Sequence, residues 1–305
     1  MTSAGSARVA AAVEDSFRTL PDVPSWFQPG ENVEVGSASL ENALERARQP
    51  DDPRPDGSRE GNKEGALDLT YALTDTQFHD LVFPATSPVG LARSASRAPT
   101  ATYFVEADLL DTVEDRFLAG GATESLSIAY EQGSDVTVNQ TIIYADEPEV
   151  GGTHGAAPAD GEIQQPSKSD IVRWHGADLQ IDGVSIDELQ SFSIDISGMA
   201  RFRRGQSRTA TAAVVGAYEP SLSVTATLQD GTQREYAYGS TGATSPETEI
   251  DGRPATASFA NPAGNLVTYD LAGLQPTTFD WADFTSADTD ITDPTDYHVK
   301  DVSVQ

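Results

Sequence analysis

The chain has 305 residues, and 48 aspartates and glutamates against 19 lysines and arginines give it a formal net charge of −29 at pH 7. Because 38% of its residues are hydrophobic, we expect a folded protein and not a disordered acidic tail. The absence of cysteine excludes disulfide scaffolds, thiolate metal sites and cysteine nucleophiles.

The acidity itself predicts a protein that works in concentrated salt. In dilute salt a surface with this net charge repels itself, whereas at 1 M salt the Debye length is only about 3 Å. Only three of the 19 basic residues are lysines: Lys63, Lys168 and Lys300. Acid excess with few lysines is typical of salt-in organisms and their viruses, and we expect a haloarchaeal source.

Export and membrane segments are not predicted. No run approaches the roughly 18 apolar residues that a transmembrane helix needs. Residues 1–17 are interrupted by Glu14 and Asp15 and are too polar for a signal-peptide core, so we expect synthesis in the cytoplasm and no membrane partner. A chain this acidic, without a broad basic face, is also not expected to grip a nucleic-acid backbone.

The first 66 residues are predicted to contain two short helices, at residues 9–20 and 39–48, with Ser39 as N-cap of the second. The stretch between them is expected to be extended. Residues 49–65 contain no apolar residue except proline and glycine, so they are predicted to form a long exposed loop.

After this loop the hydrophobic period changes to two, which predicts strands. The expected strands of the first half are residues 66–73, 100–109, 123–131 and 134–144. Gln132-Gly133 is a plausible hairpin turn between the last two. The polar residues 145–169 are predicted to be another loop or an inserted linker.

The second half continues with strands separated by turn residues. The expected strands are residues 171–181, 186–196, 209–215, 221–228, 233–238, 255–260 and 265–271. Asp182-Gly183 and Asp230-Gly231 are predicted hairpin turns, and the acidic tail 286–305 ends in a strand-like segment, residues 298–304. This spacing predicts an all-β sandwich or barrel with one or two short helices.

No residue pattern predicts catalysis or metal binding. The four histidines, His79, His154, His175 and His298, stand in no metal or nucleophile motif, and structural roles are the better interpretation. Carboxylates are too abundant for any pair to be diagnostic of glycoside hydrolysis.

Two further motifs have equally plain interpretations. The acidic tail cluster lacks the glycine and terminal glutamate of a calcium loop, so we interpret it as a solvated surface; its members are Asp288, Asp290, Asp293 and Asp296. The sequon at Asn139 falls in a predicted strand of a chain without an export signal, and we treat it as chance.

One feature runs against the composition: Arg201, Arg203, Arg204 and Arg208 lie within eight positions between two predicted strands. They are either a loop paired with acidic neighbours of the same subunit or a contact with another copy of this acidic chain, because guanidinium groups bind carboxylates bidentately. We expect the inter-subunit contact. Nucleic-acid binding is the third alternative.

The order of these elements resembles the major tail tube protein of long-tailed, siphovirus-like viruses. The similarity starts at the polar loop 60–65 before the first long strand. It continues through FLAGGATESLSI at residues 117–128 and is most evident in ADLQIDGVSIDELQSFSIDI at residues 177–196. The arginine-rich loop and VVGAYEP at residues 214–220 complete it, so the resemblance covers about residues 60–285.

The resemblance implies a structural virion protein without catalysis, cofactor or metal. Such proteins form rings, usually hexamers, whose inner sheets join into a β-barrel, and the rings stack into a tube through which genome DNA leaves the capsid. The implied partners are the protein itself and other tail proteins, namely tape measure, tail terminator and baseplate. Double-stranded DNA would pass without specific binding, and the tail would be assembled in the host cytoplasm.

The expected organisation has three parts: residues 1–66 as N-terminal arm and polar loop, 67–285 as the tail-tube sandwich with the insertion-like loop 145–169, and 286–305 as an acidic arm. Leu126-Ser127-Ile128 and Phe192-Ser193-Ile194 hint at an internal repeat, which leaves open a hexamer of single domains or a trimer of duplicated ones. The alternatives are an exported, adhesin-like β-sandwich and a carboxylate-dependent glycoside hydrolase.

Overall fold

A computed structural model describes residues 7–48, 55–83, 89–90, 97–108, 112–282 and 290–305. Within these residues the chain is built from strands, with two short α-helices, α1 (His79–Val82) and α2 (Thr232–Tyr238). The predicted all-β fold class is therefore confirmed. In the described part of the chain no helix is long and apolar enough to span a membrane.

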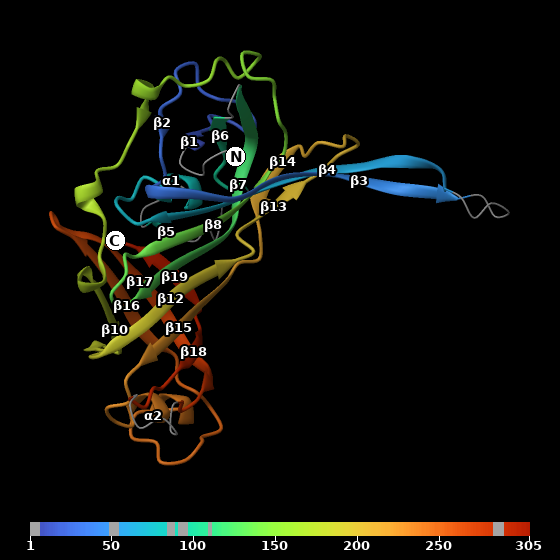
Figure 1. Cartoon of the computed structure of the whole chain (residues 1–305). Helices are drawn as coiled ribbons and strands as arrows, with labels where there is room; N and C mark the ends of the chain where they lie inside the picture. The colour runs from blue at the N-terminus through green and yellow to red at the C-terminus, as the bar shows by residue number, and fades with distance from the viewer. Residues whose placement is uncertain (1–6, 49–54, 84–88, 91–96, 109–111, 283–289) are drawn as a thin grey trace.

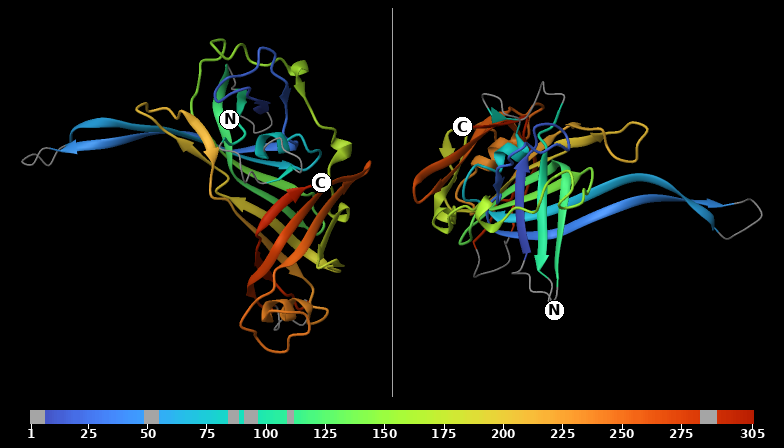
Figure 2. Two further views of the ribbon diagram at one scale, coloured as in Figure 1. Left: turned by 180° about the vertical axis from the view of Figure 1, so that it is seen from behind. Right: turned by 90° about the horizontal axis from the view of Figure 1, so that it is seen from above.

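Seventeen of the strands form three linked sheets, which Figures 1 and 2 show from three sides. Sheet I contains, in order, β9 (Ile163–Gln164), β2 (Trp26–Phe27), β1 (Ala7–Val13), β6 (Ala101–Asp108) and the first half of β7 (Val113–Glu131). Sheet I is antiparallel except for the parallel pair β2 and β9.

Sheet II is the largest sheet and is antiparallel throughout. Its order is β3 (Glu31–Arg48), β4 (Pro55–Ala72), β8 (Thr137–Tyr144), the second half of β7, β12 (Leu189–Ser197), β15 (Glu219–Ala226), β18 (Thr295–His298) and the end of β17 (Gly264–Phe279).

Sheet III lies against sheet II. Its order is β11 (Val184–Ser185), β10 (Ala177–Ile181), β16 (Arg253–Asn261), most of β17, β19 (Asp301–Val304) and β5 (Val89–Gly90). A separate hairpin consists of β13 (Ala200–Arg203) and β14 (Ala212–Val215).

Two long strands pass from one sheet into the next, and each does so at a glycine. In β7 the pairing with β6 ends at Gly121 and the pairing with β8 begins at Ala122, next to Gly120 with φ 67°. In β17 the pairing changes from β16 and β19 to β18 just after Gly273, with φ 66°. Residues other than glycine rarely adopt this left-handed conformation, so glycine permits both bends.

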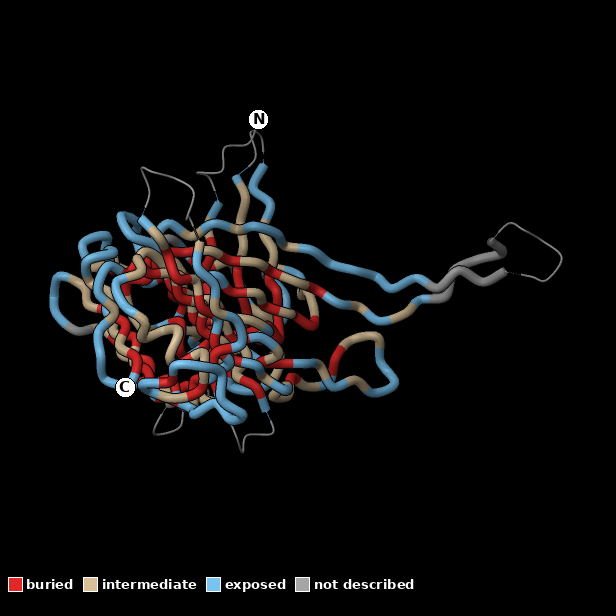
Figure 3. Tube along the Cα trace, turned by 90° about the horizontal axis from the view of Figure 1, so that it is seen from below, coloured by how far each residue is buried: buried red, intermediate tan, exposed pale blue. Residues whose placement is uncertain are grey.

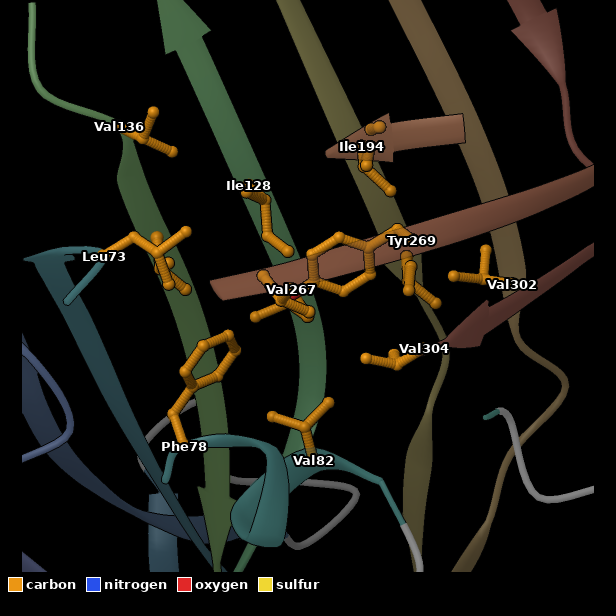
Figure 4. Close-up of a cluster of buried hydrophobic side chains, with 14 of the residues drawn as sticks. Leu73, Phe78, Val82, Ile128, Val136, Ile194, Val267, Tyr269, Val302 and Val304 are labelled. Carbon is orange, nitrogen blue, oxygen red and sulfur yellow. The ribbon is translucent and has the colours of Figure 1, made fainter. Parts of the chain in front are cut away.

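The main core fills the space between sheets II and III. Figure 4 shows β17 running across β7 and β12, with Val267 and Tyr269 facing Ile128 and Ile194. Phe78 and Val82, from the segment around α1, close one end of this core. The alternation of buried and partly exposed residues along β7, β8, β12 and β15 places every second side chain in the core, as expected for strands with one buried face.

The period-two segments were predicted well, but both N-terminal helices were predicted wrongly. Residues 9–13 belong to β1 and residues 39–48 to β3. Of the predicted loop 49–65, residues 55–65 belong to β4, and residues 49–54 lie outside the described part. Strand pairing overrides the helix-like spacing of Leu40, Leu44 and Ala47, because β4 supplies hydrogen-bond partners along the whole of β3.

The C-terminal half contains one misassigned element. Residues 233–238, predicted as a strand, form most of α2, and Asp230-Gly231 precedes this helix and makes no hairpin turn. By contrast, Asp182-Gly183 is the two-residue turn between β10 and β11, as predicted. The polar stretch 145–169 is mostly irregular but carries β9.

The described residues of the tail, 290–305, supply β18 and β19, whose Tyr297 and Val302 are each 1% exposed. Strands or core residues from all three expected parts of the chain meet in the same hydrophobic cluster. The division into three parts remains a prediction.

Candidate functional site

The first candidate surface is a hairpin that leaves the body. Residues 39–48 of β3 and 55–64 of β4, here called the hairpin arm, pair only with each other, because β8 pairs with β4 from Gly65 onward. Figure 3 shows the described arm extending from the body with little buried surface. Leu44 is 56% exposed. A two-stranded ribbon of this kind is marginally stable alone in water.

Two of the four clustered arginines hold the root of the hairpin arm. The Arg204 guanidinium pairs with Glu64 at 2.7 Å and donates to the carbonyl oxygens of Lys63 and Arg208. Arg208 pairs with Glu60 at 2.9 Å and donates to the carbonyl of Gly61. Arg208 also donates to the side-chain oxygen of Asn42 on the other strand, so one guanidinium bridges both strands of the arm.

The other two arginines of this group behave differently. Arg201 and Arg203 lie on β13 with exposed side chains, and neither guanidinium makes a hydrogen bond or ion pair with any residue that the structure describes. Of the four arginines, the two in the loop after β13 therefore pair within the subunit, and the two on β13 face solvent. The predicted inter-subunit role of the four arginines remains a prediction.

A second group of charges fixes the arm to the body just below its root. Lys63 pairs with Asp146 at 2.7 Å, and Arg18 pairs with the same carboxylate. Partial burial acts to raise the pKa of Asp146, but the hydrogen bond from Lys63 and the charges of Arg18 and Lys63 outweigh it, so the pKa lies below its usual value.

The neighbouring Glu147 has the same arrangement. Arg116 pairs with it at 2.6 Å and also donates to the backbone oxygen of Ala38 in β3. Burial acts to raise the pKa of Glu147, but hydrogen bonds from Arg116 and Tyr144 lower it further than burial raises it. These half-buried pairs tie the root of the arm to the body.

The second candidate surface is the outer face of sheet II, the side turned away from sheet III. Strand register places Ser221, Asp195, Ser127, Asn139 and Thr70 in one row across β15, β12, β7, β8 and β4. The next row contains Ser223, Ser193 and Ala129, with Asp296 of β18 opposite Ser223. We call this surface the hydroxyl face, since serine and threonine dominate it.

The charges on the hydroxyl face all have one sign. The carboxylates on it include Asp68, Glu131, Asp195, Glu219 and Asp296, and across the described positions of β4, β7, β8, β12, β15 and β18 the face has neither lysine nor arginine. The carboxylates are held by hydroxyls: Asp296 accepts from Ser223 and Thr278, both at 2.7 Å. These two hydrogen bonds, from Thr278 first, lower the pKa of Asp296.

The four histidines do not gather. His79 is buried, and its Nε2 lies 2.6 Å from the Tyr269 hydroxyl inside the core. Burial lowers the pKa of His79 to about 4, so the ring is neutral at pH 7. Among the described residues, no three histidine, aspartate or glutamate side chains form a group suited to a metal ion. Asp288 of the acidic tail cluster lies outside the described residues.

The tail cluster is also divided among different surroundings. Asp290 is exposed, Asp293 is buried, and Asp296 lies on the hydroxyl face. Sequence inspection missed the hydroxyl face because it becomes visible only when strand register is known. The alternation of serine with isoleucine, leucine or valine in β7, β12 and β15 was the available signal.

Comparison with known proteins identifies a family. A model of the family described as phage tail tube protein matches residues 5–299. The search of curated proteins finds no match. Among solved structures, a chain of the sheath-tube complex of an extracellular contractile injection system, PVC, in its extended state is similar with 16% identity and a TM-score of 0.36. That match covers 44% of this chain and 90% of the other.

The tail tube family is a family of structural proteins and not of enzymes, which agrees with the interpretation of the sequence. The family model extends over both candidate surfaces, and membership implies a component of a virion. Since the match covers nearly the whole chain, this protein belongs to the phage tail tube protein family.

Proposed function

We propose that this protein is the repeating subunit of the tail tube of a long-tailed virus of a halophilic archaeon, with the hydroxyl face lining the channel for genome DNA. The observation that carries the proposal is the composition of the hydroxyl face. It combines small hydroxyl side chains with carboxylates and, in its described strands, has no lysine or arginine.

Such a surface suits a moving polyanion. Duplex DNA carries one charge per about 1.7 Å of axis, and proteins grip it mainly by bringing lysine and arginine to its phosphates. A face whose only charged groups are carboxylates repels the phosphates. Its serine and threonine side chains are short and do not project into the channel. Duplex DNA would therefore slide past the face without sticking to it.

Ring closure and stacking would give partners to the exposed elements. The hairpin arm is marginal as a free ribbon, so we propose that neighbouring copies cover its exposed Leu44. The exposed guanidiniums of Arg201 and Arg203 are then available for carboxylates of an adjacent subunit, while Arg204 and Arg208 hold the arm in position. Tape measure, terminator and baseplate proteins would complete the tail.

Salt would decide whether the subunits meet at all. Each copy carries a net charge of −29, so bringing several copies into a ring in dilute salt is opposed by strong repulsion. Concentrated brine shortens the range of that repulsion to a few ångströms. We therefore propose hexameric rings that form and stack in molar salt.

The first experiment is negative-stain electron microscopy of the purified protein over a range of concentrations in several-molar KCl. We expect rings or hollow tubes with a bore that admits duplex DNA. Dispersed monomers at every salt and protein concentration, even after addition of preformed tail-tip complexes as seeds, would contradict the proposal.

The lining is tested separately with tubes that carry new cations. Ser127→Arg with Ser193→Arg places two guanidiniums on the hydroxyl face, and Thr256→Arg with Ser258→Arg places two on the outward side of β16 as a matched control. We expect the first variant alone to retard DNA release from reconstituted tails. Equal release from both variants would assign the lining to another face.

The inter-subunit role of the arginines has its own test. Arg203→Glu is compared with Arg173→Glu, an equal charge reversal at another exposed position. Assembly in high salt should fail or need a higher protein concentration only for the first. Unchanged assembly of both variants would remove Arg203 from the interface.

A further inference from the structure

A small cavity lies between the turn that follows β11, the segment from the end of β15 into α2, and residue 293. Its volume is about 170 Å³, and its polar lining includes Asp187, Thr227, Asp230, Gln233 and Asp293. Among the described residues that line it, none is lysine, arginine or histidine. The cavity thus offers oxygen atoms and negative charge without an opposing positive charge in its wall.

Asp293 is the unusual member of this lining. Asp293 is 5% exposed, and its Oδ1 has no hydrogen-bond partner among the described residues. Burial, with an addition from the charge of Asp230, raises the pKa of Asp293 to about 6. A buried carboxylate oxygen without a partner is costly, and proteins usually compensate it with a hydrogen bond, an opposite charge or a metal ion.

The guanidinium that stacks on the lining residue Tyr236 is already paired with another carboxylate. Arg253 pairs with Asp182 at 2.8 Å, and its guanidinium stacks on the Tyr236 ring at 4.0 Å from the centroid. On the side of Asp293, the Tyr297 hydroxyl donates to the Gln233 side-chain oxygen. The hydrogen bond occupies one lone pair of that oxygen and leaves another for a further ligand.

We propose that this cavity is a calcium site, with Asp293 and Asp230 as its charged ligands, neutral oxygens of Gln233 and Thr227 as further ligands, and water in the remaining positions. Calcium accepts six to eight oxygen ligands in flexible geometry, which suits a mixed set of carboxylate, amide and hydroxyl oxygens. Two carboxylates balance the dication. Mg²⁺ demands a tighter octahedron and holds its waters, so it fits this set less well.

A bound ion would connect three parts of the chain. Asp293 lies beside the end of β15, where its backbone N–H donates to the carbonyl of Ala226 at 3.0 Å. Asp230 starts the turn into α2, with its Oδ1 accepting from the Thr232 backbone N–H at 2.8 Å. Calcium would therefore fix the α2 segment against the end of the sandwich.

The test uses the full chain in concentrated KCl, which screens weak binding of Ca²⁺ to the acidic surface. Equilibrium dialysis with ⁴⁵Ca²⁺ counts tightly bound ions for the wild type, for Asp293→Asn and for Asp290→Asn, an exposed neighbour of equal charge. We expect one tightly bound ion in the wild type and in Asp290→Asn, and none in Asp293→Asn. Equal counts in all three proteins would overturn the site.

Thermal unfolding gives a second readout that does not depend on assembly. At a Ca²⁺ concentration a hundredfold above Kd, the wild type should gain about 5 °C in Tm, and Asp293→Asn should gain nothing. Without Ca²⁺, Asp293→Asn should melt at or above the wild-type temperature, because the buried charge is gone. The same gain with Mg²⁺ as with Ca²⁺ would overturn the assignment to calcium.

If Asp293→Asn fails to fold, Asp230→Asn replaces it, because that side chain is exposed. We expect it to weaken calcium binding at least tenfold while the calcium-free Tm stays unchanged. Binding as tight as in the wild type would remove Asp230 from the site.

Discussion

The sandwich body and the hairpin arm are both antiparallel pairings, yet different interactions hold their strands in place. In the body, side chains such as Phe259, Ile194 and Tyr269 are at most 1% exposed and pack between two sheets. In the arm, the contacts to the rest of the chain include ion pairs and hydrogen bonds from Arg204 and Arg208 and the ion pair between Lys63 and Asp146. Burial of apolar surface does not need low salt, whereas half-exposed ion pairs weaken as salt rises. Concentrated brine should therefore leave the body firm and let the arm move.

The largest expected effect tests the body. Phe259 is fully buried and contacts Phe192 and Tyr269 with ring centroids 5.9 Å apart in each case. Phe259→Ala should lower the free energy of unfolding by about 3–5 kcal/mol, since it leaves a cavity between the sheets. Denaturant unfolding in high salt measures the change. A loss below about 1 kcal/mol would show that the core is less tightly packed than described.

The next effect comes from His79, whose pKa is about 4 in the fold against 6.5 ordinarily. Between these values the unfolded chain binds a proton that the folded chain does not, so stability falls as pH drops from about 6.5 to 4. The loss reaches about 3 kcal/mol, from 1.36 kcal/mol per pKa unit. Unfolding curves at several pH values measure this loss of unfolding free energy. His79→Gln keeps a side chain able to hydrogen-bond to Tyr269 and should reduce the dependence of the unfolding free energy on pH. An unchanged pH dependence would mean that other groups cause it.

A smaller effect is expected where β17 changes sheets. Gly273 has φ 66°, and an added Cβ would lie 3.0 Å from the Cβ of Lys300. Gly273→Ala should cost about 1–2 kcal/mol of unfolding free energy. Gly161→Ala is the control, because an added Cβ there meets nothing within 4 Å and its φ is not positive. Equal losses in the two variants would show that backbone conformation is not the cause.

Removing the arginine contacts of the arm should have the smallest effect on global stability and a large effect on the local stability of the arm. Arg204→Gln with Arg208→Gln should alter the free energy of unfolding by less than about 1 kcal/mol, because these pairs are partly exposed. Hydrogen exchange of the amides in residues 39–44 and 60–64 should nevertheless become faster. Arg201→Gln with Arg203→Gln, in the same loop, should leave it unchanged. Equal exchange in both double variants would mean that the guanidiniums do not hold the arm.

The body and the arm also differ in how well their strands could be predicted from the sequence. Strands of the body were predictable because one face of each strand is buried. Hydrophobic residues such as Leu126, Ile128 and Ile194 therefore recur at every second position. The arm was not predictable in the same way, since no core imposes a period on it. Leu40, Leu44 and Ala47 happen to have helical spacing, and the partner strand that overrides it lies beyond a polar gap.

The candidate surfaces show the same limit. The arginine loop was visible as a local cluster, yet the partners of Arg204 and Arg208 lie about 140 residues earlier in the chain. The similar triplets Leu126-Ser127-Ile128 and Phe192-Ser193-Ile194 proved to lie on adjacent strands, with Ile128 opposite Ile194. Their likeness reflects a shared environment, with serines on the hydroxyl face and aliphatic residues in the core.

The two strands that pass between sheets give the subunit mechanical continuity. Because β7 belongs to sheets I and II, and β17 to sheets III and II, sheet II is joined to each of the other two sheets by an unbroken backbone. A pull that tends to separate the sheets is thus resisted by covalent bonds as well as by side-chain packing. The bends lie at Gly120 and Gly273, so each long strand changes direction at one defined point while each sheet keeps its register.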